Sequence, residues 1–248
     1  MADEWFISEM VVKSRATIKP GMTEVSLLEE GPASDKLPIT KRDEASMMRA
    51  ITGEPAFAQL LMRKLLMPDE GVRYALEVAR PIIYKPDMVP GDVDLVCAHE
   101  QNPAQAVGVE AKQVRAITSN GEEDELKRTG KILGGIRQAN GLRELGFHRS
   151  YYLVLVATDG RMKTENNVFA RGVRGRTVTA IQEVIFSESG KRALHPDVGV
   201  VVVELVQPAP RAFDELSNVI ATVVRMARPV EQPTQLTNRV ADALGIKR

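Results

Sequence analysis

The pattern of apolar and polar positions changes period several times along the chain, and each change predicts a different element. Between Asp43 and Leu66 apolar residues recur at helical spacing, and Gly53-Glu54-Pro55 divides this run into two helices. Residues 72–84 alternate and are rich in β-branched and aromatic side chains, which predicts a strand. Two further strands are expected at 91–98 and 106–115, and the short links between the three strands predict hairpins.

The second half of the chain contains a continuous apolar run at 151–157, and a second fully buried strand is expected at 198–206. Runs without alternation are typical of central strands that are covered on both faces. We expect helices at 122–142, 177–187 and 212–227, followed by a short amphipathic tail, and a strand or arm at 5–18. This order of elements predicts an α/β fold in which helices flank a mixed β-sheet.

The predicted helix at 122–142 contains three glycines, Gly130, Gly134 and Gly135. Each glycine costs about 1 kcal/mol in a helix interior relative to alanine. The glycines therefore predict either a break in the helix or a helix face that is pressed against another backbone.

The length of 248 residues, with 44% apolar residues, is sufficient for one main domain with extensions. We expect an N-terminal extension or arm at 1–42, a core domain at 43–210 and a C-terminal helical extension at 211–248.

The composition excludes several functional classes. Lys plus Arg and Asp plus Glu both number 33, so the overall charge gives no sign of a nucleic-acid partner. The single Cys97 excludes an internal disulfide and a cysteine-rich zinc site, and it fits a reducing compartment. Gly130-Lys131 lacks the remaining residues of a phosphate-binding loop. No stretch approaches the roughly 20 apolar residues that span a bilayer, so we expect a cytoplasmic protein without membrane contact.

Charged residues interrupt the strands at 91–98 and 106–115. Alternation places Asp92, Asp94, Glu110 and Lys112 on one face of the hairpin, while the apolar residues of these strands face the core. Glu110 and Lys112 are two residues apart, which is roughly 7 Å along a strand. The simplest structural alternative is a surface hairpin with an exposed salt bridge.

The same residues predict a metal site. Crowded carboxylates have raised pKa values unless a cation compensates their charge. Mg²⁺, or Mn²⁺, prefers hard oxygen ligands and retains waters and substrate phosphate oxygens. The expected ligands are Asp94 and Glu110, with the Ala111 carbonyl as a possible further ligand and Asp92 as the alternative to Asp94.

Gly91-Asp92-Val93-Asp94 followed by Glu110-Ala111-Lys112 resembles the signature of the PD-(D/E)xK nuclease superfamily. The resemblance extends over about residues 43–157, where the expected order αβββαβ is that of the restriction-endonuclease-like core. It implies a metal-dependent nuclease that acts on DNA in defence, repair or recombination, with Asp94, Glu110 and Lys112 as catalytic residues. The alternative is a catalytically inactive protein of this fold that functions in nucleic-acid binding or assembly. Fifteen residues separate Asp94 from Glu110, which predicts a hairpin loop at 99–105 that is longer than a tight turn.

The resemblance also indicates additional residues. Glu54, with Glu44 as the alternative, is placed like the first-helix glutamate that supplements the metal site in many members. An exposed acid in the first turn of a helix is the structural alternative for Glu54. Gln113 and Gln138 resemble glutamines of the family, although strand alternation directs Gln113 away from the other site residues, and Leu142 stands where one branch has a tyrosine.

Basic residues concentrate in the expected loop at 160–176, which holds five bases against one acid. Contacts to a nucleic-acid backbone are electrostatic, so Arg171, Arg174 and Arg176 are candidate phosphate contacts, with a solvated loop as the alternative. Lys131 shares a helical stripe with Gln138 and is a further candidate, with a solvated helix face as the alternative. The expected partners are nucleic acid and either a second copy of the chain or another protein of a larger system.

Overall fold

The computed structural model describes residues 7–12, 43–68, 70–79, 92–118, 124–127, 129–158, 175–187, 193–206 and 218–247. In these residues one sheet of eight strands has the order β1-β8-β7-β6-β4-β3-β2, and β5 also pairs with β4. The strands are β1 (Ile7–Val12), β2 (Val72–Val78), β3 (Val93–His99), β4 (Asn102–Thr118), β5 (Asp124–Lys127), β6 (Arg149–Thr158), β7 (Gly199–Val206) and β8 (Asn218–Arg225). The helices are α2 (Glu44–Thr52), α3 (Pro55–Lys64), α5 (Gly130–Leu145), α6 (Gly175–Phe186) and α7 (Thr234–Ala243).

The sheet is mixed, as predicted. β4, β6 and β7 are parallel neighbours at its centre. β2 and β3 continue the sheet antiparallel on one side, and β8 and β1 do so on the other. The side chains described in β6 and β7 are buried almost throughout, including Glu204 of β7, which confirms that both are central strands covered on both faces.

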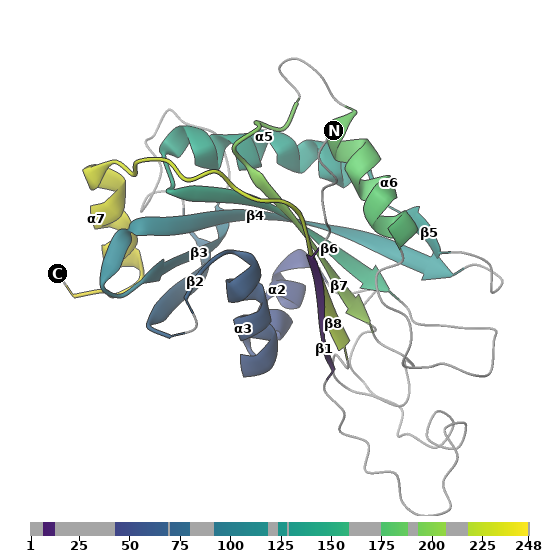
Figure 1. Cartoon of the computed structure of the whole chain (residues 1–248), viewed down its shortest axis with the longest axis horizontal. Helices are drawn as coiled ribbons and strands as arrows, with labels where there is room; N and C mark the ends of the chain where they lie inside the picture. The colour runs from purple at the N-terminus through teal and green to yellow at the C-terminus, as the bar shows by residue number, and fades with distance from the viewer. Residues whose placement is uncertain are drawn as a thin grey trace, which may run out of the picture.

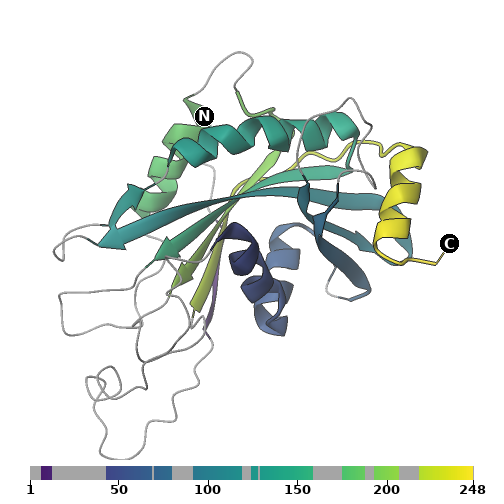
Figure 2. The ribbon, with the colours of Figure 1, turned by 180° about the vertical axis from the view of Figure 1, so that it is seen from behind.

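Helices cover both faces of the sheet (Figures 1 and 2). α2 and α3 lie on one face and contribute residues such as Ile51, Phe57 and Leu60 to a core shared with β3, β4, β6, β7 and β8. α5 and α6 lie on the other face and pack against β4, β6 and β7. α7 packs beside the β3–β4 hairpin, where Leu236 and Val240 join a third apolar cluster. Both faces of β4 are therefore covered.

The division of residues 43–66 into two helices is confirmed. The Asp43 side chain caps α2 by accepting a 2.7 Å hydrogen bond from the Ser46 N–H. Pro55 occupies the first turn of α3, where its missing N–H is not needed. The cap fixes the first turn of α2, which carries Glu44.

The predicted helix at 212–227 is wrong, because the structure has strand β8 at Asn218–Arg225. Val219, Ile220, Thr222, Val223 and Val224 are β-branched, and such residues favour a pleated, packed strand over a helix. β8 pairs with β7 and with β1, so the expected N-terminal arm also contributes a strand to the sheet. The expected C-terminal helical extension consists of β8 and helix α7 in the described residues.

The predicted helix at 122–142 is correct only from Gly130 onward. Residues Asp124–Lys127 form β5, which pairs antiparallel with the end of β4. This pairing extends the sheet, and α5 begins at Gly130.

The hairpin between β3 and β4 is tighter than expected. His99 pairs with Asn102, so Glu100 and Gln101 form a two-residue turn. The fifteen intervening residues belong mostly to the strands, because β4 begins at Asn102 and the register shifts between Cys97 and His99.

The structure does not describe 80–91, which includes the end of the predicted strand at 72–84, or 159–174, which includes most of the basic loop. Among the helices that it does describe, none is both long and apolar enough to cross a membrane.

Candidate functional site

Asp94 and Glu110 occupy neighbouring positions on β3 and β4. The strands pair Leu95 with Val109, and one further step along this antiparallel ladder places Asp94 opposite Glu110. Asp94 Oδ2 accepts a 2.6 Å hydrogen bond from the Ala111 N–H. Asp92 precedes β3 and is exposed. Asp94 is therefore the acid whose carboxylate lies against β4.

The site lies at a gap in the pairing of one edge of β4. β6 pairs with the other edge from Val107 to Ala116. On the site edge, the pairs with β3 extend to Val109 and those with β5 begin at Arg115. Within the gap the Ala111 N–H donates to Asp94, and the Gln113 N–H donates to Glu44 Oε2 at 3.0 Å. Side-chain carboxylates thus replace the missing strand.

Lys112 extends its ammonium into this gap. Its Nζ donates to Glu110 Oε1, and to the Ala111 carbonyl at 2.7 Å. It also lies 3.5 Å from Glu44 Oε1, which projects from the first turn of α2. β4 and α2 thus bring two carboxylates and one carbonyl to a single ammonium, and the charge of Asp94 on β3 acts on the same group.

The site is buried at Glu110 and partly exposed at Lys112 and Glu44. The Glu110 side chain is 1% exposed, Lys112 is 17% exposed and Glu44 is 25% exposed. α5 covers this face of β4, so the alternative of an exposed surface salt bridge is wrong. Solvent reaches the site past Lys112 and Glu44.

Burial perturbs the protonation of the carboxylates. It raises the pKa of Glu110 to about 8, with repulsion from Asp94 adding to the rise and Lys112 opposing it. Burial likewise raises the pKa of Asp94 to about 6, against the hydrogen bond from Ala111 and the charge of Lys112. Burial lowers the pKa of Lys112, but its carboxylate neighbours, Glu110 first, more than offset this and the net pKa is raised. The site therefore favours bound positive charge.

Glu77 adds negative charge next to Asp94. β2 pairs Leu76 with Leu95 and Val78 with Val93, which places Glu77 between these pairs and opposite Asp94. Glu77 has a positive φ of 50° and forms an exposed ion pair with Arg49 of α2. Its charge contributes to the raised pKa of Asp94.

The structure places Glu44, rather than Glu54, beside Lys112 and Gln113. Glu54 is the N-cap residue of α3 and follows the end of α2. The nine residues of α2 separate the two glutamates by about 13 Å. Sequence alone gave little basis for choosing Glu44, because its contacts span 68 and 69 residues.

The other predicted residues lie outside this cluster or outside the described residues. Gln113 has a buried side chain, and its backbone N–H contacts Glu44. In α5, Gln138 is half-buried and Lys131 is exposed. Arg171 and Arg174 are outside the described residues, and Arg176 is the second residue of α6.

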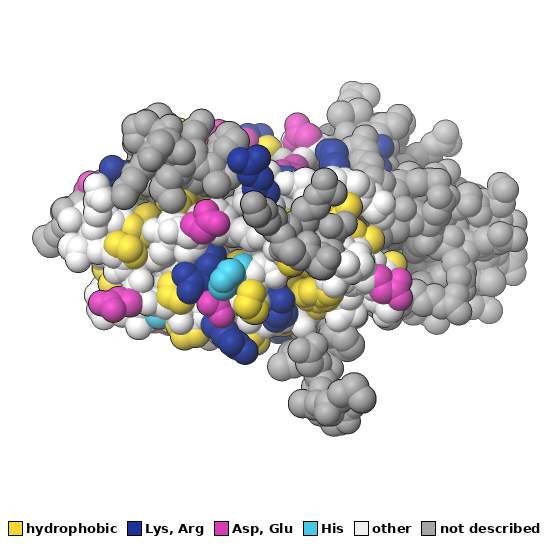
Figure 3. All heavy atoms as spheres, turned by 90° about the horizontal axis from the view of Figure 1, so that it is seen from above, with side chains coloured by type: hydrophobic (Ala, Val, Ile, Leu, Met, Phe, Trp, Pro, Cys, Tyr) yellow, Lys and Arg dark blue, Asp and Glu magenta, His cyan; other side chains and the backbone are white. Residues whose placement is uncertain are grey.

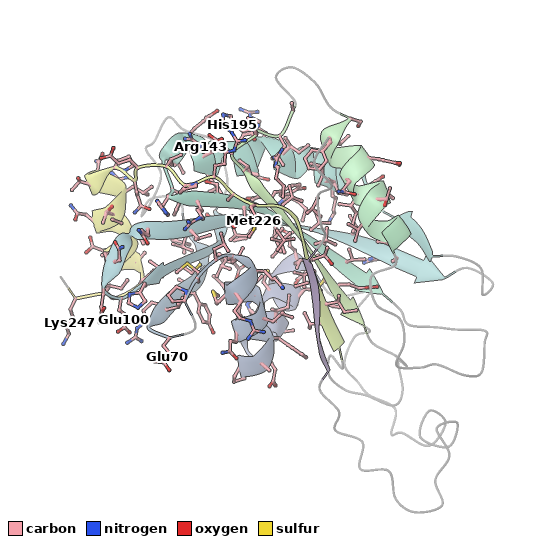
Figure 4. The ribbon with its side chains drawn as sticks, viewed as in Figure 1. Glu70, Glu100, Arg143, His195, Met226 and Lys247 are labelled. Carbon is pink, nitrogen blue, oxygen red and sulfur yellow. The ribbon has the colours of Figure 1, made fainter. Side chains whose placement is uncertain are left out.

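A second charged cluster lies at the far end of α5. Arg143 donates to Asp197 Oδ2 at 3.0 Å, and Arg228 lies 3.9 Å from the same carboxylate. Arg225 donates to the carbonyls of Val198 and His195. Figure 3 shows basic, acidic and histidine side chains close together on the face seen from above, and Figure 4 shows Arg143 and His195 side by side. These contacts tie the segment before β7 to α5 and to the end of β8.

A scan of protein-family models, a search of curated proteins and a search of solved structures found no match to the chain. Among the residues that the structure describes, no group of three His, Cys, Asp or Glu side chains has the arrangement of a metal centre. A metal ion here would therefore depend on fewer carboxylates, together with backbone oxygen, water or substrate.

Proposed function

We propose that the chain is a metal-dependent nuclease that hydrolyses phosphodiester bonds, with DNA as its substrate. The observation that supports this most directly is the convergence of Asp94, Glu110 and Lys112 at the gap in the edge of β4. The residues of the signature come from two strands, and the register brings them together. Apart from the division of the first helix into α2 and α3 and the additional strand β5, the order of elements around them follows the αβββαβ order that the resemblance implies.

The donor set fits a hard divalent cation. Asp94, Glu110 and the Ala111 carbonyl would hold Mg²⁺ or Mn²⁺, with waters and phosphate oxygens as the remaining ligands. The same oxygens already attract a cation, because Lys112 Nζ bonds to Glu110 and to the Ala111 carbonyl. When bound, the metal would supply charge stabilisation at the scissile phosphate and a bound water of lowered pKa.

The side chains of this site have separate tasks in the proposal. Asp94 and Glu110 bind the cation next to the phosphate, and their burial strengthens the attraction between the carboxylates and the cation. The ammonium of Lys112 is the cationic donor that interacts with the phosphate and stabilises the negative charge that develops on the phosphate oxygens. Glu44 keeps Lys112 in place and accepts the Gln113 N–H.

Cleavage assays test the proposal. Supercoiled plasmid and single- and double-stranded oligonucleotides are incubated with Mg²⁺, Mn²⁺ or EDTA. Asp94→Asn, Glu110→Gln and Lys112→Met should each lower the metal-dependent rate by at least about 100-fold. Glu100→Gln is a matched control, because Glu100 is an exposed acid that pairs with Arg73 on the same hairpin. Equal rates in the wild type and the three site variants, or no cleavage of any substrate, would contradict the proposed function.

Such a result, together with retained DNA binding, would favour the alternative of a noncatalytic nucleic-acid-binding protein. Electrophoretic mobility shifts at two salt concentrations measure this binding, because contacts to phosphates weaken as salt increases.

A further inference from the structure

The backbone of α5 lies directly on the side chain of Lys112. Gly135 is buried, and a Cβ added to it would lie 2.5 Å from Lys112 Cγ and 2.7 Å from the Tyr152 hydroxyl oxygen. Real Cβ atoms essentially never come within 3.0 Å of another heavy atom. Only glycine therefore allows α5 to approach β4 and β6 this closely.

The side chain of Tyr152, on β6, holds the same part of α5 in place. It pairs with Glu110 in the parallel register of β4 and β6, and it is fully buried. Its hydroxyl donates a 2.6 Å hydrogen bond to the Ile132 carbonyl in the first turn of α5. Because a Cβ at position 135 would lie within 3.0 Å of atoms of both side chains, Tyr152 and the Lys112 stem would both oppose a larger residue there.

Gly134 provides the contrast within the same helix. It is exposed, and a Cβ at this position would meet no atom within 4 Å. Of these two adjacent glycines, only Gly135 is required for contact with the site. The predicted contact of this helix face with another backbone is therefore wrong in detail. Of the glycines at 130, 134 and 135, only Gly135 is closely packed, and its nearest neighbours are side-chain atoms of Lys112 and Tyr152.

The contact limits the conformations that are open to Lys112. Its aliphatic stem lies between β4 and the α5 backbone, so the side chain cannot move toward α5. The ammonium therefore points into the gap at the edge of β4, where Glu110 and the Ala111 carbonyl accept its hydrogen bonds. A lysine side chain otherwise has many rotamers, and its confinement reduces the entropy lost when the ammonium is held.

We propose that Gly135 and Tyr152 are positioning residues that hold α5 on the stem of Lys112 and so direct its ammonium into the gap of β4. The proposal rests on the proposed function only for its catalytic consequence. The steric part concerns the folded protein and is testable without any nuclease activity.

Acetylation of lysines, followed residue by residue with mass spectrometry, tests the steric part. Gly135→Ala should increase the acetylation rate of Lys112 relative to the exposed Lys247 by about tenfold or more, because α5 is displaced from the stem. Gly134→Ala should leave this ratio as in the wild type and raise the melting temperature, since alanine is the better helix former. A folded Gly135→Ala protein with the wild-type ratio would overturn the proposal.

A variant pair covers the case in which Gly135→Ala does not fold. Lys112→Ala removes the Cγ atom that the new methyl would meet. Recovery of a folded protein in the Lys112→Ala/Gly135→Ala double variant would support contact with the lysine stem. Failure to fold in both backgrounds would assign the contact to Tyr152 alone and overturn the positioning of Lys112.

The catalytic consequence has a separate kinetic readout. In the cleavage assay Gly135→Ala should lower kcat with little change in KM, because it misplaces a group that acts in the transition state. Tyr152→Phe should do so less strongly, since it keeps the ring and loses only the hydrogen bond to Ile132. An unchanged kcat in an active, folded Gly135→Ala protein would overturn this part. Absence of cleavage in the wild type would contradict the proposed function. The acetylation experiment would still test whether Gly135 and Tyr152 position the Lys112 side chain.

Discussion

Replacing Glu110 with glutamine should remove a large part of the pH dependence of stability. Burial raises the pKa of Glu110 from 4.5 to about 8. For an acid whose pKa is higher in the folded state, the unfolded chain ionises first as pH increases. The wild-type protein should therefore lose stability between about pH 4.5 and pH 8, and the loss should be complete above this window.

The magnitude follows from the two pKa values. Each pKa unit corresponds to about 1.4 kcal/mol, so the rise of the Glu110 pKa corresponds to a ceiling of about 5 kcal/mol. The side chain is 1% exposed, so solvent screening reduces this value little. Glutamine resembles the protonated acid and does not titrate. The variant should be within about 1 kcal/mol of the wild type at pH 5 and more stable by about 4 kcal/mol at pH 9.

Denaturant unfolding at pH 5, 6, 7, 8 and 9, with EDTA to exclude divalent cations, measures this difference. Glu100→Gln is the control, because it makes the same substitution at a carboxylate that is 45% exposed on the same hairpin. A gap between the wild type and Glu110→Gln that changes by less than about 1 kcal/mol from pH 5 to pH 9 would refute the reasoning.

Three further predictions test the site and the fold. Addition of Mg²⁺ at about 100 times its Kd should stabilise the wild type by about 2.7 kcal/mol in thermal unfolding and should not stabilise Asp94→Asn. Glu44→Gln should lower the cleavage rate at least about tenfold, because Lys112 loses a charged partner. Glu54→Gln should retain the wild-type rate. If Glu54→Gln lowered the rate and Glu44→Gln did not, Glu54 would be the glutamate that supports the site. Gln232→Ala should cost about 2 kcal/mol in denaturant unfolding, because Gln232 bonds to Pro103, His148 and Thr237, and a cost below about 0.5 kcal/mol would exclude this anchoring role.

The local geometry of the site was accessible from sequence because it depends on strand alternation. Two residues that are two positions apart on a strand share a face whatever else the chain does, and Glu110 and Lys112 do so in the structure. The choice between Asp94 and Asp92 required the register, which a single sequence does not contain. Glu44 required the position of α2 relative to β4, which depends on tertiary packing.

The errors in secondary structure have a common physical origin. The sequence patterns of the segments that form β8 and β5 predict helices, yet both segments are strands that pair with β7 and β4. The β-branched composition of β8 favours a strand, but the apolar positions of 212–227 also suit a helix. Pairing partners supplied by distant parts of the chain decide such cases, so local periodicity alone could not.

The site originates in unequal strand lengths. β4 has 17 residues, whereas β3 has 7 and β5 has 4. The edge of β4 consequently has a stretch that neither partner covers, and its buried N–H groups require acceptors. Asp94 and Glu44 provide them, and Glu110, buried on the same strand, adds a further carboxylate. Carboxylates in such a place are costly to ionise, so a cation that binds them stabilises the fold and the site together. The same gap that breaks the pairing of the sheet therefore explains why Lys112 is held there, and the proposed divalent cation would bind to the same carboxylates.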